Sequence, residues 1–362
     1  KLAPFDDQLN KKLMSCAHKG DLEKDNAYQI YFRGVQTQLD LYREENISIQ
    51  SYLSQKSQEF GAISGAQNVE HKGETLTMPQ ASILLKEQDE ALRKNIFEKI
   101  ASRRLQDVDA LSDLYTDLIA KRTELAKNAG FTNYRDYKFK EMGRFDYTKE
   151  SCFDFHNAVE QHIVPLVKKI QEKKLNKLGK SQFKPWDTSV NPDGKAPLKP
   201  FKSGQEMLDK TVAIFEEIDS KFAGFLKTME EMKHFDLESK PGKSPGGYNY
   251  PLYETGAPFI FMNSVGSQND FTTMVHEGGH AVHSFLTHHL ELTSFKSFPS
   301  EIAELASMSM ELLTMDHWDK VYDDSDDLYR AKKEQIEGTL TLLPWIAQID
   351  AFQHWVYENH DH

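Results

Sequence analysis

The sequence has few cysteines, no long apolar run and no excess of basic residues, and each of these features argues against a class of protein. Only Cys16 and Cys152 are cysteines among 362 residues, too few for a disulfide framework and without the close spacing of a cysteine metal site. No apolar run approaches the roughly 18 residues of a membrane span. The net charge of −12 argues against nucleic acid as a partner. We therefore expect a protein of a reducing compartment such as the cytoplasm, with inert cysteines and neither membrane nor nucleic acid among its partners.

Most of the chain has the apolar periodicity of helices. Residues 79–129 predict two long antiparallel helices that stop at Gly130, and residues 206–232 predict one amphipathic helix. After Pro241, glycine and proline interrupt the pattern, and the apolar run 258–263 predicts a short strand. The expected fold is mainly α, with a small β-sheet.

Residues 276–280 read His-Glu-Gly-Gly-His inside a predicted helix. Histidines four residues apart lie on one face of a helix, so His276 and His280 can reach one metal ion, while Glu277 lies ready to take a proton from a metal-bound water. The opposite face carries an apolar stripe of Phe271, Met274, Val275, Ala281, Val282, Phe285 and Leu286. The two glycines weaken a helix, which favours a close approach by another backbone or by substrate. The pattern predicts zinc-dependent peptide hydrolysis.

A catalytic zinc takes three protein ligands as a rule, so one ligand remains to be found. A third histidine in the extended motif would stand at position 286, which is Leu286. The next predicted helix begins at Pro299 and carries Glu301, Glu304 and Glu311. The dipole of the helix already explains an acid in its first turn, at Glu301. Spacing leaves both Glu304 and Glu311 as candidates.

Other polar and aromatic side chains have more than one interpretation. Tyr248 and Tyr250 either position substrate or cover the core. His283 contacts substrate, orients a metal ligand, or is a packed surface histidine. We interpret His354, His360 and His362 as ordinary exposed or capping residues. Gly242-Lys243-Ser244 lacks the first glycine and the helix of a phosphate-binding loop.

Four segments together resemble the metallopeptidase family of thimet oligopeptidase and oligoendopeptidase F, and the oligoendopeptidase F branch is the more similar. They are residues 243–248, 258–263, 276–284 and 301–307. The resemblance extends upstream to Pro185-Trp186-Asp187 and to Arg122, Ala126, Gly130, Phe131, Tyr134 and Tyr137. In that family the third ligand is a glutamate followed three residues later by serine. The resemblance thus implies Glu304 as the ligand, with Ser307 as the serine.

The resemblance implies a zincin-like, mainly helical metallopeptidase with one Zn²⁺ per chain. Residues 1–140 would be an incomplete helical cap, and residues 141–362 a catalytic domain that lacks its C-terminal part. The implied activity is hydrolysis of internal bonds of short unfolded oligopeptides, with Glu277 as general base. The alternatives are a zinc carboxypeptidase or dipeptidyl carboxypeptidase with the same site, and a non-catalytic peptide-binding remnant.

The sequence also departs from that family. Family members have a longer N-terminal helical region. They also have a segment, beyond the point that corresponds to residue 362, in which a tyrosine, and in some branches a histidine, hydrogen-bonds the tetrahedral intermediate. We therefore expect residues 1–362 alone to bind zinc but to hydrolyse peptides poorly, and a complementing C-terminal segment to restore the rate.

Overall fold

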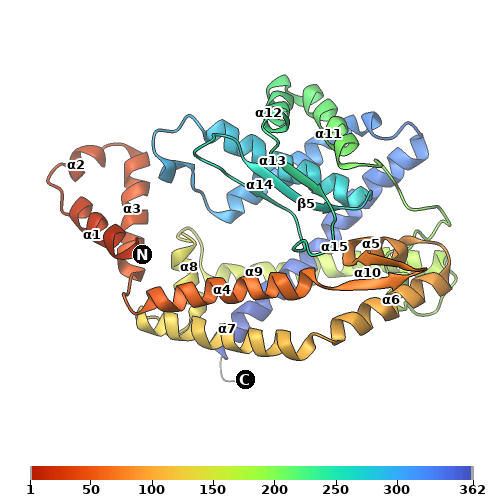
Figure 1. The fold of residues 1–362 in the computed structure, drawn as a ribbon, viewed down its shortest axis with the longest axis horizontal. Helices are drawn as coiled ribbons and strands as arrows, with labels where there is room; N and C mark the ends of the chain where they lie inside the picture. The colour runs from red at the N-terminus through yellow and green to blue at the C-terminus, as the bar shows by residue number, and fades with distance from the viewer. Residues whose placement is uncertain (1, 360–362) are drawn as a thin grey trace.

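The computed structural model describes residues 2–359, and most of them lie in helices (Figure 1). The α-helices are α1 Ala3–Met14, α2 Lys19–Leu22, α3 Asn26–Leu41, α4 Asn46–Gly65, α5 Met78–Ile83, α6 Glu90–Leu105, α7 Val108–Asn128, α8 Tyr134–Glu141, α9 Lys149–Ala158, α10 Val164–Lys177, α11 Gly204–Ile218, α12 Ser220–Glu231, α13 Gln268–Thr287, α14 Ser300–Leu313 and α15 Ser325–Glu358. Short 3₁₀ or π segments are η1 Leu84–Lys86, η2 Val159–Ile163, η3 Pro185–Asp187, η4 Thr293–Lys296 and η5 Thr314–Lys320. The predicted mainly α class is confirmed.

Two small sheets complete the described chain. Strands β1 Asn68–His71 and β2 Glu74–Thr77 form an antiparallel hairpin that the sequence analysis did not predict. The second sheet has the order β3-β5-β4, from β3 Phe235–Glu238, β4 Tyr248–Tyr250 and β5 Phe259–Ser264. Strand β5 confirms the strand predicted at 258–263, and it runs parallel to β3 and antiparallel to β4. This sheet packs against α13, so the predicted small sheet is present.

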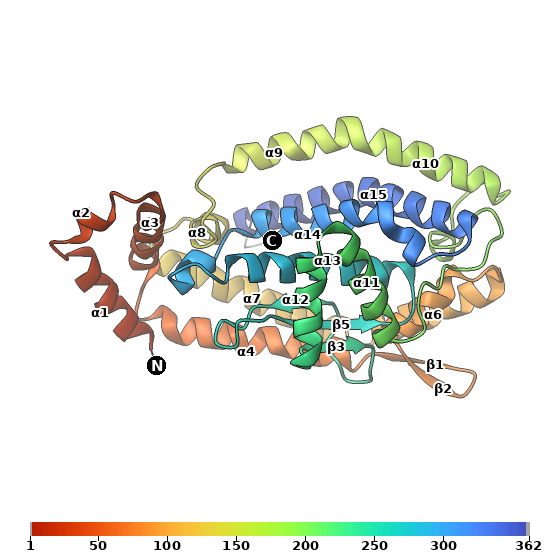
Figure 2. The ribbon, with the colours of Figure 1, turned by 90° about the horizontal axis from the view of Figure 1, so that it is seen from above.

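The helices form two layers joined by α15. Figure 1 shows α4 and α7 along one side of the molecule, and α11 to α14 with β5 on the other. Helix α15 begins beside η5 and ends near α7, where Arg122 donates a 2.8 Å hydrogen bond to the Tyr357 hydroxyl. Figure 2 shows α9 and α10 running along α15 on its outer side. Helix α15 thus links the two layers and supports a third, outer row of helices.

The helices of residues 79–129 are not the antiparallel pair that we predicted. Helices α6 and α7 follow one another end to end (Figure 1), separated by Gln106 and Asp107. The Asp107 carboxylate accepts hydrogen bonds from Arg103 at 2.6 Å and from Gln67 at 2.8 Å, which fix the break. The apolar face of α7 packs on α4 instead. The predicted end of α7 is correct, because Gly130 has the positive φ of +86° that a helix stop favours.

The single helix predicted for residues 206–232 is two helices. Asp219 has extended backbone between α11 and α12, and its carboxylate accepts a 2.8 Å hydrogen bond from the backbone N–H of Lys221. An aspartate in this position satisfies the free N–H groups of a new helix. The apolar spacing continues across this break because both helices bury apolar faces in the same core.

The largest core lies between α11, α12, α13, η5 and β5. Its fully buried large side chains include Phe215, Leu226, Ile260, Phe271, Met274 and Trp318. Burial of each such side chain contributes about 1.5–3 kcal/mol. The core therefore holds α13 firmly along the side opposite its two histidines.

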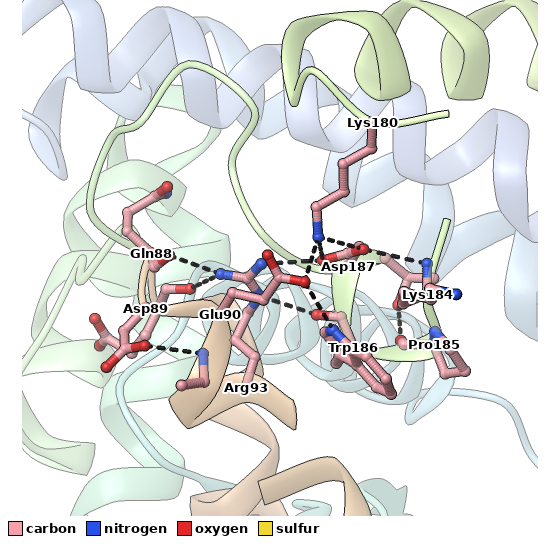
Figure 3. A network of polar contacts seen from close by, with 12 residues as sticks. Gln88, Asp89, Glu90, Arg93, Lys180, Lys184, Pro185, Trp186 and Asp187 are labelled. Carbon is pink, nitrogen blue, oxygen red and sulfur yellow. Dashed lines mark hydrogen bonds and ion pairs between the residues drawn. The ribbon is translucent and has the colours of Figure 1, made fainter. Parts of the chain in front are cut away.

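A buried ion cluster ties η3 to α6 (Figure 3). The Arg93 guanidinium donates to Asp187 at 3.0 Å and to the carbonyl oxygen of Trp186 at 3.0 Å. The Lys180 ammonium donates to both Asp187 oxygens, at 2.7 and 2.8 Å, and pairs with Glu90. Arg93 and Asp187 are buried, so each depends on the other to offset its loss of hydration. The segment Pro185–Asp187, singled out in the sequence, is thus an anchor between distant parts of the chain.

Candidate metal centre

Helix α13 carries the His-Glu-Gly-Gly-His pentad and begins with a capping box. The Ser267 hydroxyl accepts a hydrogen bond from the backbone N–H of Asp270, and the Asp270 carboxylate accepts one from the backbone N–H of Ser267. The apolar stripe predicted for this helix is buried, except for Phe285, which is partly buried, and Leu286, which is 49% exposed. Phe285 takes the last core position by stacking on Phe225, with ring centroids 4.5 Å apart, and Leu286 lies one residue further round the helix.

Helix α14 brings a carboxylate to the two histidines. Glu304 Oε2 lies 3.2 Å from His276 Nε2, and Glu304 Oε1 lies 3.7 Å from His280 Nε2. One ligand atom from each of these three residues lies within 4.8 Å of the other two. Two imidazole nitrogens and a carboxylate oxygen are a frequent protein ligand set for catalytic zinc.

Glu311 lies on the other side of the His276 ring. Its Oε1 atom is 2.7 Å from His276 Nδ1, and its Oε2 atom accepts a 2.6 Å hydrogen bond from Gln335 of α15. A carboxylate at Nδ1 keeps a proton there and leaves Nε2 free to bind a metal. The two glutamates that spacing could not separate therefore have different positions, with Glu304 at the ligand atoms and Glu311 behind His276.

Ser307 holds the Glu304 carboxylate. Its buried hydroxyl lies 3.2 Å from Glu304 Oε2 and also lies near the carbonyl oxygens of Ala303 and Glu304, at 3.3 and 3.1 Å. The glutamate and the serine three residues later thus form one unit on one face of α14. This contact gives a physical reason for the Glu-x-x-Ser spacing.

The Glu277 side chain is buried beside the three candidate ligands. It is 5% exposed, and its Oε2 atom has no hydrogen-bond partner among the described residues. Burial raises the pKa of Glu277 to about 7, against the opposing effect of His276. A carboxylate with such a pKa can both accept and return a proton near neutral pH.

The two glycines of the pentad pack against two different neighbours. A Cβ on Gly279 would lie 2.8 Å from Ser307 Cα, so the backbones of α13 and α14 are in direct contact there. A Cβ on Gly278 would lie 2.8 Å from the ring of Phe215, on the core side. The expected close approach by another backbone is therefore present at Gly279, and a phenyl ring fills the corresponding space at Gly278.

Glu301 lies outside this cluster. Its carboxylate accepts a 2.9 Å hydrogen bond from Arg144 Nε and another from the Tyr147 hydroxyl. Burial alone would raise the pKa of Glu301, but these two neighbours and the backbone lower it. Glu301 is one turn before Glu304, so its contacts hold the start of α14 against the segment before α9.

Among the described residues, no hydrogen bond or ion pair joins the three predicted substrate residues to the metal cluster. Tyr248 and Tyr250 are exposed on β4, and Tyr248 stacks on Phe261 with ring centroids 4.9 Å apart. Between them, Asn249 donates a 3.4 Å hydrogen bond to the Glu277 carbonyl oxygen. The His283 ring stacks on Phe298 at 4.0 Å, and its buried Nδ1 atom has no partner among the described residues. Their substrate roles remain predictions.

The interpretation of His354 as an exposed or capping residue is wrong, because its side chain is only 4% exposed. It packs between α9 and α15 against the Phe153 ring, with centroids 4.9 Å apart. His360 and His362 lie outside the described residues. Sequence reasoning also missed Asn249 and Gln335, for which no motif gave a signal.

The residues fit a zinc ion by the chemistry of their donors. His276, His280 and Glu304 converge with ordinary zinc ligand atoms, and Glu277 keeps a buried oxygen unpartnered on the same helix turn. Such an unpartnered buried oxygen costs about 1–3 kcal/mol or more unless something at the site uses it.

Comparisons with known proteins identify relatives of this chain. The sequence model described as peptidase family M3 matches residues 83–362. The chain is 27% identical over 213 residues to an oligoendopeptidase F homolog of Lactococcus lactis subsp. lactis (strain IL1403). These 213 residues are 59% of this chain and 32% of that protein. An X-ray structure of an oligoendopeptidase F superposes with a TM-score of 0.94 and 25% identity over 100% of this chain and 63% of its own. A structure of PZ peptidase A with an inhibitor also superposes with a TM-score of 0.94 and 25% identity. This superposition covers 99% of this chain and 63% of the other.

The matches also show how much of each relative is covered. The chain spans about a third of the length of that curated relative and less than two thirds of these solved chains. Within residues 2–359, none of the helices combines the length and apolar character that crossing a membrane requires.

Proposed function

The chain belongs to peptidase family M3, and on that premise we propose that it is a zinc-dependent peptidase that hydrolyses internal bonds of short, unfolded peptides. One observation carries the proposal: the buried Glu277 carboxylate, whose Oε2 atom has no partner among the described residues, lies on the same helix turn as two histidines that converge with Glu304. This arrangement supplies a ligand set and a proton acceptor together.

His276, His280 and Glu304 would hold the zinc ion. When bound, zinc supplies Lewis-acid chemistry, because it polarises a carbonyl group and lowers the pKa of a water. Glu311 holds the proton on His276 Nδ1, and the Ser307 hydroxyl orients the Glu304 carboxylate. These two contacts orient the ligand atoms of His276 and Glu304 toward each other.

Glu277 would carry the proton in both halves of the reaction. Its buried carboxylate takes a proton from the attacking water and later gives it to the nitrogen of the leaving amine. A pKa near 7 suits both steps, because neither the protonated nor the ionised form is strongly preferred. The Asn249 side chain fixes the backbone of Glu277 from the neighbouring strand.

The sheet beside α13 offers a place for an extended peptide. Strand β4 pairs with β5 on one side and is an edge of the sheet among residues 2–359. The free backbone groups of an edge strand can pair with an added strand. Tyr248 and Tyr250 are exposed along β4, where they would contact the side chains of such a peptide. We propose that His283, one turn after His280, contributes to the same surface.

The nearest alternative is removal of residues from a peptide's C-terminus by the same centre, and a non-catalytic peptide-binding protein is the other. One experiment separates the three: a mixed library of peptides, half of them C-terminally amidated, is incubated with the protein and the products are mapped by mass spectrometry. Internal cleavage of amidated peptides that a chelator abolishes supports the proposal. Loss of cleavage on amidation identifies a carboxypeptidase, and absence of cleavage by the zinc-loaded protein overturns the proposed activity.

A complementing C-terminal segment with further hydrogen-bond donors remains a prediction. Its test is the turnover of one fluorogenic peptide before and after the corresponding segment of an oligoendopeptidase F is added. We expect a gain of about a hundredfold or more, the usual effect of one donor to a developing oxyanion.

A further inference from the structure

We propose that Cys152, Asp350 and His354 form a second metal site, suited to Zn²⁺, between α9 and α15, with His156 beside it. One ligand atom from each of Cys152, Asp350 and His354 lies within 4.8 Å of the other two. Cys152 and His156 are four residues apart on α9, and Asp350 and His354 are four residues apart on α15. Residues with this spacing share a helix face, so two facing helices each present a pair of zinc ligand types.

His354 gives the strongest indication that a ligand belongs here. Its ring is buried, and Nε2 makes no hydrogen bond among the described residues, although it lies 3.4 Å from Asp350 Oδ2. A buried polar atom without a partner destabilises the folded chain unless a ligand uses it. Burial also lowers the pKa of His354, which keeps the ring in the neutral form that binds metals.

His156 supports the set from α9. Its Nε2 atom lies 2.7 Å from Asp350 Oδ2, and its ring centroid lies 5.9 Å from that of His354. It therefore holds the Asp350 carboxylate in place beside the proposed ligands. The ring of Phe153 packs 4.9 Å from His354 and that of Phe139 6.0 Å from it, so the site has an apolar wall that limits access of water.

The donor types select zinc among common ions. Thiolate and imidazole ligands favour zinc over magnesium or calcium, and zinc also accepts a carboxylate oxygen beside them. A thiolate and a carboxylate together balance the charge of a divalent ion. Burial raises the pKa of the Cys152 thiol, so a metal ion has to displace its proton on binding.

Arg135 contacts the proposed ligand His354, and Arg144 acts electrostatically on Cys152. The Nη1 atom of Arg135 lies 3.5 Å from His354 Nδ1, its longest contact, and Arg135 also pairs with Asp136 at 2.9 Å and with Glu358. Metal binding at Nε2 leaves a proton on Nδ1, so this weak contact must open. Arg135 keeps its two carboxylate partners when it does, and these offset its charge.

The site would fasten the outer row of helices to α15. Helices α9 and α10 run along α15 (Figure 2), and the proposed ligands come from the first turn of α9 and the last turns of α15. None of them comes from α13 or α14, which carry the catalytic candidates. The ion would therefore stabilise the fold, and its loss would lower the melting temperature without removing zinc from the catalytic centre.

Cobalt distinguishes the two sites, because a cobalt ion bound to a thiolate has a near-ultraviolet charge-transfer band and His276, His280 and Glu304 include no sulfur. The full chain, stripped of metal, is titrated with Co²⁺. We expect about two ions per chain and the charge-transfer band. Cys152→Ser should lose the band and one ion, Cys16→Ser should keep both, and Glu304→Ala should keep the band.

His354→Asn gives a second measurement that does not depend on sulfur. In a Glu304→Ala background, added Zn²⁺ should raise the melting temperature, and His354→Asn should abolish that rise, while circular dichroism checks that each variant is folded. Absence of the band in the wild-type chain, or its survival in Cys152→Ser, would overturn the site. Failure of peptide hydrolysis would not bear on it, since no measurement here uses activity.

Discussion

Gly279 sets the distance between the helix that carries the histidines and the helix that carries Glu304. In Gly279→Ala the added carbon would lie 2.8 Å from Ser307 Cα, 3.0 Å from Met310 Cβ and 3.2 Å from the Ala306 carbonyl oxygen, whereas ordinary contact begins at 3.4 Å. Two of these atoms belong to backbone, so α14 must retreat by about 0.6 Å. Interiors are close-packed and do not absorb such a shift without cost.

The cost has two parts. Overpacking costs about 1–3 kcal/mol, and the higher helix propensity of Ala offsets about 1 kcal/mol, so we expect a net loss of stability of about 0–2 kcal/mol. The retreat of α14 also draws Glu304 away from His276 and His280. Displaced ligands and their supports typically cost about 10–100-fold in metal affinity, and we expect that loss in Gly279→Ala.

Gly278→Ala is the matched control. The substitution raises the helix propensity by the same amount. Its added carbon lies close to the ring of Phe215 on the core side and does not contact α14. Zinc affinity is measured by competition with a chromogenic chelator, and stability by thermal unfolding. A large loss of affinity in Gly279→Ala and a small one in Gly278→Ala supports the reasoning. Wild-type affinity in a folded Gly279→Ala would refute it.

Three further predictions follow from other contacts. Glu304→Ala should lose its zinc on dialysis, whereas Glu311→Gln should keep zinc but bind it about 10–100-fold more weakly. If Glu311→Gln contained no zinc after dialysis and Glu304→Ala still did, the two roles would be reversed. Asp187→Ala should cost about 3–5 kcal/mol because it leaves Arg93 buried and unpaired, and the double variant Arg93→Met/Asp187→Leu should cost less; equal losses in urea unfolding would contradict this. Burial alone would raise the pKa of Asp187, but Lys180 and Arg93 lower it, so its contribution is complete above about pH 4 and falls away as the pH drops through the lowered pKa; an unchanged acid unfolding curve in Asp187→Asn would count against it.

The sequence predicts the parts of the site whose residues are close together in the chain better than the parts that depend on how two helices pack. His276, Glu277 and His280 lie within one helix turn, so the fixed geometry of a helix places them on its surface before any packing is known. Glu304 and Glu311 lie on one face of the next helix, and only the alignment of that helix against α13 separates them. The contact of Gly279 with Ser307 fixes this alignment, and a sequence does not show it without a resemblance.

The relations that sequence reasoning missed are long-range. His156 and Asp350 are 194 residues apart, so no spacing rule joins Cys152 to His354, and the rule that dismissed both cysteines tested only local spacing. The same limit applies to α6 and α7, whose periodicity predicted two helices but not their direction. The partner of α7 is α4, earlier in the chain. The break at Asp219 escaped notice because both flanking helices bury their apolar faces in one core.

The central claim is that Glu277 moves the proton for a zinc centre built by His276, His280 and Glu304. The direct measurement is turnover of an internally quenched peptide by Glu277→Gln, with zinc content determined on the same sample. We predict unchanged zinc and a loss of about a thousandfold or more in turnover, since the ligands remain and the proton acceptor does not. Wild-type turnover by a zinc-loaded Glu277→Gln would contradict the account.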